Sequence, residues 1–351
     1  MEKKFITGNE AIAEAAVQAG CRYFFGYPIT PQSELPEHLA KRLPELGGCF
    51  LQAESEIAAI YMVFGAAGAG ARVMTSSSSP GISLKQEGIS YIAGAELPCV
   101  IVNIMRGGPG LGGIQPTQSD YFQATKGGGH GDYHLIVIAP STVQEAVNLT
   151  IEAFDLADKY RNPVMILGDG YLGQMMEPVE FKTMKPQPLP KKDWALTGAK
   201  GRPRRIIKTL YLQPEILEQR NLVLHRKYLE IIKNEIRVET YLAEDAEIII
   251  AAYGTLARIA KTAIKLLREK GIKTGLVRPI TLFPFPYQTF AQISDRIKKI
   301  LVVEMSLGQM VEDVKLGVCG KAKVHFYGRT GGMVPSYDEI VTEVEKVMKK
   351  A

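Results

Sequence analysis

Two short stretches carry the residue types and spacings best suited to chemistry. In the first, Tyr27-Pro28-Ile29-Thr30-Pro31, two prolines flank Thr30 and hold the backbone extended and stiff, so we expect a shaped loop. The second, Gln52-Ala53-Glu54-Ser55-Glu56, follows a short apolar run and precedes a helix of small residues. A carboxylate at such a junction lies in the crevice where open α/β sheets bind ligands, so Glu54 is a candidate acid. The simpler alternative is that Glu54 and Glu56 only offset the helix dipole.

An alternation of short apolar strands and helical patterns surrounds these stretches and must position them. It predicts a doubly wound parallel α/β sheet over residues 1–180, with a serine-rich turn after the third strand. The expected strands span 23–25, 49–51, 71–75, 99–105, 135–139 and 164–167, and the expected helices span 10–19, 56–68, 83–93 and 143–160.

The alternation stops after residue 180. Residues 181–240 are expected to form a linker, proline-rich at Lys185–Pro190, and an amphipathic helical arm over 213–237. Packing of this arm on a partner subunit and packing on its own domains both remain open. Residues 241–351 are expected to form a smaller α/β domain, in which Glu304–Gln309 at a strand end is interpreted as structural. Its expected strands span 247–253, 273–277, 300–304 and 323–327, and its helices span 256–270, 310–316 and 337–350.

The composition narrows the possible functions. With 351 residues, 46% of them hydrophobic, the chain can fill two cores, and its net charge of +5 is modest. The densest basic run, Lys200–Arg205, has no interleaved aromatic residues, which argues against nucleic-acid binding. We find neither an apolar run of about eighteen residues nor a signal peptide, so we expect a cytoplasmic protein with no membrane role.

The potential metal ligands are scattered. Cys21, Cys49, Cys99 and Cys319 offer no pair at ligand spacing, so we expect no zinc or iron–sulfur site in this chain. The five histidines have no metal partner in sequence and receive no role.

Two glycine motifs resemble cofactor-binding signatures. Gly108–Gly113 matches the dinucleotide pattern, with Asp132 at the distance of a ribose contact, but a turn follows it in place of a helix. Gly168-Asp169-Gly170 stands at a strand end, where thiamin diphosphate enzymes begin a metal and diphosphate motif, yet residues 192–197 contain no asparagine to complete it. A turn is therefore the preferred interpretation, and we do not expect this chain to hold the metal.

Four motifs occur together in one chain: Tyr27–Pro31, Gln52–Glu54, Met105–Pro109 and Gln118–Asp120. This set resembles the alpha subunit of 2-oxoacid:ferredoxin oxidoreductases over nearly the whole chain. Gly198–Pro203 and the arm after it are most similar to the branched-chain, 2-oxoisovalerate type of that family. The resemblance implies a pyrimidine-type domain for thiamin diphosphate, followed by a smaller transketolase C-terminal-like α/β domain.

The resemblance also implies the site. Glu54 matches the acid that protonates the aminopyrimidine ring, Arg106 matches an arginine beside the substrate, and Thr30 matches a residue near the thiazolium. Glu56 is expected only to cap its helix, and a solvated Arg106 on a loop is the alternative for that residue. The implied cofactor-binding residues are Glu54, Tyr27, Pro28, Ile29, Thr30, Ser77 and Ser78, with a plain serine-rich turn as the alternative for the last two.

The reaction of the family is a coenzyme A-dependent oxidative decarboxylation of a 2-oxoacid, with electrons passed to ferredoxin. The resemblance implies that thiamin diphosphate is shared with a beta subunit that holds the diphosphate and Mg²⁺. It further implies gamma and ferredoxin-like delta subunits or domains, with iron–sulfur clusters outside this chain. A branched-chain oxoacid is implied, whereas pyruvate or 2-oxoglutarate would need only a different pocket wall. Two other functions stay open: a self-contained enzyme of the transketolase or decarboxylase kind, and a non-catalytic assembly subunit.

Overall fold

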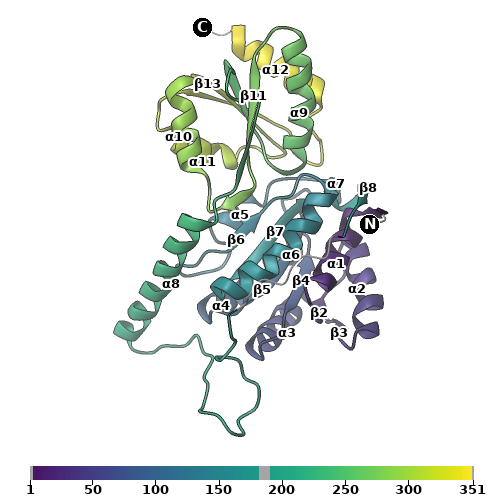
Figure 1. The fold of residues 1–351 in the computed structure, drawn as a ribbon, viewed down its shortest axis with the longest axis vertical. Helices are drawn as coiled ribbons and strands as arrows, with labels where there is room; N and C mark the ends of the chain where they lie inside the picture. The colour runs from purple at the N-terminus through teal and green to yellow at the C-terminus, as the bar shows by residue number, and fades with distance from the viewer. Residues whose placement is uncertain (1–2, 182–189, 350–351) are drawn as a thin grey trace.

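The computed structural model describes residues 3–181 and 190–349, so the predicted linker at Lys185–Pro190 lies outside it except for Pro190. The chain forms a larger N-terminal and a smaller C-terminal α/β domain, and a long helix with an extended loop protrudes from the first (Figure 1). Among the residues described, no helix combines the length and apolar character needed to cross a bilayer.

The first domain is built on a seven-stranded sheet with the order β12-β6-β7-β5-β4-β2-β3. Every neighbouring pair is parallel except β12 with β6. A separate antiparallel pair joins β1 and β8. The strands are β1 (Lys4–Thr7), β2 (Tyr23–Gly26), β3 (Cys49–Gln52), β4 (Val73–Ser77), β5 (Cys99–Met105), β6 (Ile136–Ile138), β7 (Pro163–Asp169), β8 (Met176–Val179) and β12 (Thr281–Phe283).

Helices pack on both faces of this sheet, because the right-handed crossovers from β2 to β3 and from β3 back to β4 run in opposite directions and place α2 and α3 on opposite sides. α1 contacts α2 and α6, while α3 contacts α4. The predicted doubly wound sheet is thereby confirmed. The helices are α1 (Gly8–Gln18), α2 (Glu34–Glu45), α3 (Glu56–Gly68), α4 (Ser79–Gly94), α5 (Tyr121–Thr125), α6 (Val143–Tyr160) and α7 (Gly170–Gln174).

Two local expectations in this domain are wrong. The periodicity analysis missed α2, whose sequence contains prolines; Pro36 lies in its first turn, where a backbone N–H is not needed. The serine-rich stretch is not a turn, because β4 runs through Ser77 and α4 begins at Ser79 in place of residue 83. Pro80 lies at the start of α4, where its fixed φ suits a helix.

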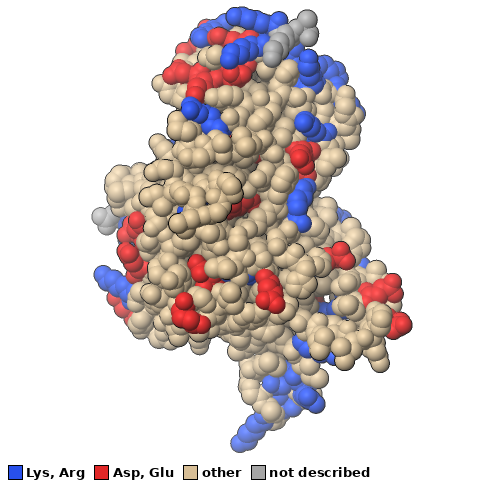
Figure 2. Space-filling view, turned by 180° about the vertical axis from the view of Figure 1, so that it is seen from behind, with Lys and Arg blue, Asp and Glu red and all other residues tan. Residues whose placement is uncertain are grey.

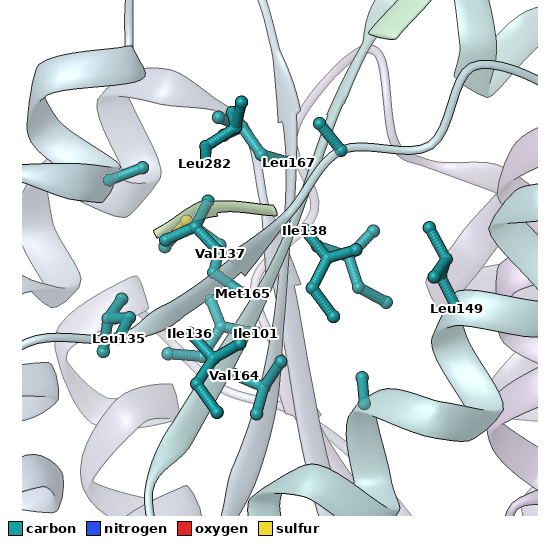
Figure 3. Close-up of a cluster of buried hydrophobic side chains, with 14 of the residues drawn as sticks. Ile101, Leu135, Ile136, Val137, Ile138, Leu149, Val164, Met165, Leu167 and Leu282 are labelled. Atoms are coloured by element: carbon teal, nitrogen blue, oxygen red, sulfur yellow. The ribbon is translucent and has the colours of Figure 1, made fainter. Parts of the chain in front are cut away.

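The core of the first domain lies between the central strands and their helices. Figure 3 shows Ile136, Val137 and Ile138 of β6 beside Val164 of β7 and Leu282 of β12, all of them buried. Every residue of β7 is buried, as expected for a parallel strand covered on both faces. These packed strands give a rigid base to the loops that follow them.

The predicted arm is α8 (Pro214–Asn234), which ends earlier than residue 237. It packs on its own chain through Leu224, Tyr228 and Ile231, which join the core of the first domain. Its other face exposes apolar side chains, and contact of that face with a partner stays a prediction. The loop before α8 protrudes at the bottom of Figure 1, and Figure 2 shows Lys and Arg gathered at its tip.

The second domain has a five-stranded sheet with the order β14-β13-β10-β11-β9, parallel except for β9. Glu304, at the end of β13, is fully buried and accepts N–H hydrogen bonds from residues 309–311 at the start of α11. This agrees with a structural role for Glu304–Gln309. The elements are β9 (Val238–Tyr241), β10 (Ile248–Ala251), β11 (Thr274–Pro279), β13 (Lys299–Glu304), β14 (Lys323–Gly328), α9 (Gly254–Glu269), α10 (Tyr287–Arg296), α11 (Met310–Val318) and α12 (Tyr337–Lys349).

The two domains are joined by more than the chain connection. β12 follows β11 of the second domain but pairs with β6 of the first. Gln118 is fully buried between the domains: its side chain donates to the carbonyl oxygen of Tyr253 at 3.0 Å and accepts from the N–H of Met305 at 3.0 Å. Contacts of this kind join the two domains and do not mark where one ends. The predicted domain boundaries at residues 180 and 240 therefore stay a prediction.

Candidate active site

One edge of the first sheet gathers the predicted site residues. β2, β4 and β5 are parallel neighbours and β3 pairs with β2, so their carboxyl ends lie side by side, about 4.8 Å apart from strand to strand. The topology therefore brings together segments that are distant in sequence. The residues that follow or end these strands are Tyr27, Pro28, Ile29 and Thr30 after β2, Glu54 and Glu56 after β3, Ser77 and Ser78 at the end of β4, and Arg106 after β5.

Arg106 is a buried side chain and not the solvated loop arginine that the sequence left open, because it is only 7% exposed. Its Nη1 donates to the carbonyl oxygen of Thr30 at 3.0 Å, and its Nη2 donates to that of Leu111 at 3.1 Å. Its Nε is buried and has no hydrogen-bond partner among the described residues. The guanidinium thus ties two loops together and keeps one donor unused.

The Tyr27–Pro31 loop presents its residues to the surface. Tyr27, Pro28 and Thr30 are exposed, whereas Ile29 is half-buried. Beside Thr30 lies a cavity of about 560 Å³ that extends to the start of α7. Its lining combines apolar side chains with one carboxylate and contains no Lys or Arg: Thr30, Pro31, Ser33, Glu34, Ile114, Gln115, Pro116, Gly170, Tyr171, Gln174 and Met175.

The two glutamates after β3 have opposite environments. Glu54 is exposed, whereas Glu56 is buried at 6% exposure. The cap of α3 is Ser55, whose Oγ accepts from the N–H of Ala58 at 3.2 Å. The structure thus contradicts the assignment of Glu56 as a mere cap: another residue caps the helix, and the Glu56 side chain turns inward.

The Glu56 carboxylate lies against the start of α4. A methyl group built on Gly81 would lie 2.7 Å from Glu56 Oε1 and 2.1 Å from Ser77 Oγ, so the glycine leaves room for both side chains. Within the described part of the chain, the Glu56 carboxylate forms no hydrogen bond. The Glu56 side chain is mostly buried, yet its carboxylate oxygens are not fully enclosed, so a donor on a bound group could reach them.

The end of β4 is lined with buried hydroxyl groups. Ser77 and Ser78 are fully buried, and neither Oγ has a hydrogen-bond partner among the described residues. The neighbouring Ser76 donates to Gln32 Oε1 at 2.5 Å, and the side-chain nitrogen of Gln32 also lacks a partner. Because buried polar atoms are nearly always paired, these groups fit a ligand that offers both donors and acceptors.

The sequence reasoning gave no role to a polar network behind these groups. Asn103 donates to Asp120 Oδ2 at 2.9 Å and accepts from the N–H of Ser79 at 3.1 Å, while Ser79 Oγ donates to the same Asp120 oxygen at 2.6 Å. Burial raises the pKa of Asp120, although these two hydrogen bonds lower it. The available signal was Asn103 itself, a polar residue in an otherwise apolar, fully buried strand.

The dinucleotide-like motif forms a closed loop. The N–H of Gly113 donates to the carbonyl oxygen of Gly107 at 2.8 Å, and the next helix, α5, begins only at Tyr121. Gly112 has a φ of +58°, and a Cβ there would lie 1.8 Å from the Gly107 oxygen. The glycine at 112 therefore serves the tight turn, and the context that a dinucleotide fingerprint needs is missing.

Asp169, the centre of the Gly168-Asp169-Gly170 motif, caps a helix. Its Oδ1 accepts from the N–H groups of Tyr171 at 2.9 Å and Leu172 at 3.1 Å, at the start of α7. The carboxylate is thus committed to the turn, as the sequence-based interpretation expected.

Comparison with known proteins decides the family. Residues 14–244 match the family described as pyruvate flavodoxin/ferredoxin oxidoreductase, thiamine diP-bdg, and residues 246–340 match pyruvate:ferredoxin oxidoreductase core domain II. The chain belongs to the pyruvate flavodoxin/ferredoxin oxidoreductase family. The resemblance to 2-oxoacid:ferredoxin oxidoreductases is confirmed, and the chain is an oxidoreductase subunit with a thiamin diphosphate-binding domain.

Individual members of this oxidoreductase family support the assignment, and one more distant structure shows the fold. The chain is 49% identical to the ketoisovalerate oxidoreductase subunit VorB of Methanothermobacter marburgensis, over 99% of this chain and 98% of the relative. A structure of the 2-oxoglutarate:ferredoxin oxidoreductase from Magnetococcus marinus, with 2-oxoglutarate, coenzyme A and succinyl-CoA bound, matches with a TM-score of 0.86 at 27% identity, over 99% of this chain and 66% of that chain. A split-gene transketolase matches with a TM-score of 0.63 at 16% identity over 98% and 99% of the two chains, which confirms the transketolase-like fold.

Proposed function

We propose that this subunit supplies the pyrimidine half of a thiamin diphosphate site shared with a beta subunit, in an enzyme that converts a branched-chain 2-oxoacid to acyl-CoA and carbon dioxide. The observation that carries the proposal is the mostly buried side chain of Glu56, whose carboxylate lies beside Ser77 and Gly81 without a hydrogen-bond donor from the described residues. When bound, thiamin diphosphate supplies the nucleophilic carbon that adds to the keto group of the oxoacid and lets carbon dioxide leave.

Glu56 is the stronger candidate for the acid that faces the aminopyrimidine ring. A carboxyl group that shares a proton with a ring nitrogen works best when water is excluded and the pKa values of the two groups are close. The burial of Glu56 supports this role, and the exposure of Glu54 argues against the assignment made from sequence. Glu54 would have to be buried by a partner subunit before it could act in the same way.

The remaining residues of the edge would hold the cofactor and the oxoacid. The unpaired hydroxyls of Ser77 and Ser78 offer hydrogen bonds to polar groups of the cofactor, and the Tyr27–Pro31 loop would lie against it. Arg106 would position the oxoacid carboxylate through its charge and its unused Nε, together with the exposed Thr30. Arg106 also keeps the loop that carries Thr30 in place.

The other parts of the reaction are assigned to partners. Asp169 is committed to its helix cap, so the diphosphate and Mg²⁺ are proposed to be held by the beta subunit. The cysteines of this chain are dispersed, so iron–sulfur clusters that pass electrons to ferredoxin are proposed on gamma and delta subunits or domains. We place the assembled enzyme in the cytoplasm, with coenzyme A as the acyl acceptor.

The cavity beside Thr30 supports a branched-chain substrate. Its side-chain lining includes Ile114, Pro116 and Met175, which suit an apolar side chain. Among the described residues, its lining also includes the carboxylate of Glu34 but no Lys or Arg, so the second carboxylate of 2-oxoglutarate would meet a like charge without a compensating cation from these residues. The 49% identity to a subunit named for ketoisovalerate agrees with this choice.

The test is purification of the native complex, followed by analysis of bound thiamin diphosphate, metals and iron–sulfur clusters and by assay with a panel of 2-oxoacids. We expect thiamin diphosphate in the complex but not on the separated chain, and a higher kcat/KM for 2-oxoisovalerate than for 2-oxoglutarate. Retention of the cofactor by the separated chain would instead indicate a self-contained enzyme, and its absence from both would indicate an assembly subunit. A higher kcat/KM for 2-oxoglutarate would overturn the substrate assignment.

A further inference from the structure

Lys85 is a buried cation on α4, directly behind the proposed acid. Its side chain is fully buried, and its Nζ donates to the backbone carbonyl oxygen of Glu56 at 3.4 Å. Within the described residues it forms no ion pair at 4.0 Å or less. Lysine is rarely buried without an ionic partner, so this position needs an explanation beyond packing.

Among the elements packed around Lys85, Glu56 is the charged residue that acts on its ammonium group. Burial lowers the pKa of Lys85 to about 8, and the charge of Glu56 opposes that shift. α3 beyond Glu56, and the strands β4 and β5, contain no charged residue at all. One turn further along α4, Gly88 packs closely on Ile60, which holds α4 against α3.

The other charged groups near α4 are engaged elsewhere. Glu87 is exposed and accepts from the hydroxyl of Tyr91 at 2.8 Å. Asp120 is bonded to Ser79 at the first residue of α4, and Asp169 caps α7. Arg106 directs its guanidinium to the Thr30 loop.

We propose that Lys85 is a positioning residue whose ammonium group keeps the Glu56 carboxylate ionised and holds the first turn of α3 in place, so that the proton shared with the cofactor lies on its ring nitrogen. This inference rests on the proposed role of Glu56. A cation close to a carboxyl group favours the ionised form, which makes the carboxyl group a stronger acid toward the ring. Lys85 itself does not touch the cofactor in this arrangement.

The arrangement sets a pH window for cofactor binding. Because the pKa of Lys85 is about 8, its charge and its help to Glu56 are lost as the pH rises through that value. The experiment therefore counts the protons taken up when the cofactor binds, because a purely structural role of Lys85 would leave that number unchanged.

The assembled complex, freed of thiamin diphosphate, is titrated with the cofactor by calorimetry in buffers of different ionisation enthalpy, at pH values on both sides of 8. Lys85→Met removes the cation next to Glu56, so the acidic midpoint of proton uptake should rise by about one pH unit. Lys85→Arg keeps the charge and should restore the native midpoint. Lys265→Met, at an exposed position on α9, is the matched control and should change nothing.

The outcomes separate this inference from the function on which it rests. An unshifted midpoint in Lys85→Met, together with loss of proton uptake in Glu56→Gln, overturns the role of Lys85 and leaves the proposed function intact. Absence of cofactor binding by the native complex overturns both. Should Lys85→Met fail to assemble, Lys85→Gln is titrated in its place, and an unshifted acidic midpoint in that variant overturns the role of Lys85.

Discussion

Arg106 donates a hydrogen bond of 3.0 Å to the backbone carbonyl oxygen of Thr30, across 76 residues of sequence. The contact joins the end of β5 to the loop after β2, so the shape of the Tyr27–Pro31 loop depends on a side chain from another strand. An arginine can make this contact and still offer a donor to a substrate, because its guanidinium carries five N–H groups in a fixed fork.

Arg106→Lys should raise the oxoacid concentration needed for half-maximal activity by about tenfold or more, because one ammonium group cannot hold both loops and the substrate carboxylate. Steady-state assays with 2-oxoisovalerate measure this, with the coenzyme A dependence as an internal reference. Arg42→Lys, on the surface of α2, is the matched control and should behave as the native enzyme. Unchanged oxoacid kinetics in Arg106→Lys would remove this residue from the site.

Glu56→Gln should reduce ferredoxin reduction by about a hundred- to ten-thousand-fold, the usual loss when one positioned proton donor is removed. Assembly should persist, since glutamine preserves the size of the side chain. Glu54→Gln is the matched variant two residues away and should retain most of the activity, because Glu54 is exposed. The reverse pattern, with Glu54→Gln inactive and Glu56→Gln active, would restore the assignment made from sequence alone.

Glu14 should contribute to stability in a pH-dependent way. Burial raises its pKa, but hydrogen bonds from His38 and Arg42 prevail and lower the pKa from 4.5 to about 2. A carboxylate with a lowered pKa stabilises the fold above its unfolded-state value, and this contribution is lost as the pH falls from 4.5 toward 2. Glu14→Gln should therefore lower the free energy of unfolding by about 2 kcal/mol at neutral pH.

Urea unfolding of the purified chain at several pH values measures this effect. The difference between native protein and Glu14→Gln should shrink as the pH falls below 4.5. Glu87→Gln is the control, because its carboxylate is exposed and bonds to tyrosine hydroxyls and not to a cation, and it should shift the unfolding energy little. A difference that does not depend on pH would contradict the assigned ionisation.

Gln118→Ala should loosen the junction between the domains. The substitution leaves the carbonyl oxygen of Tyr253 and the N–H of Met305 buried without their side-chain partner, at a cost of about 1–3 kcal/mol for each group. Calorimetric melting should show a lower Tm or two separate transitions in place of one. Gln144→Ala, a half-buried residue on α6, serves as the control, and equal melting of both variants would argue against the junction role.

The sequence by itself determined the alternation of strands and helices, the division into two α/β domains and the family. Apolar runs such as Cys99–Met105 and Val164–Leu167 are buried on both faces, so their hydrophobic content alone identified strands. The sequence also placed the candidate site residues at the strand ends, because a parallel sheet carries its ligand-binding loops there and the motif spacing marks them.

Tertiary structure alone decided which of two nearby glutamates turns inward. Glu54 and Glu56 are alike in type and two residues apart, and their difference arises because α4 packs over the first turn of α3 and covers only Glu56. The burial of Lys85, the tie from Arg106 to Thr30 and the β12 strand that enters the first sheet have the same origin. Each depends on contacts between segments far apart in sequence, and such contacts produce no periodic pattern of residues that could be recognised in one sequence.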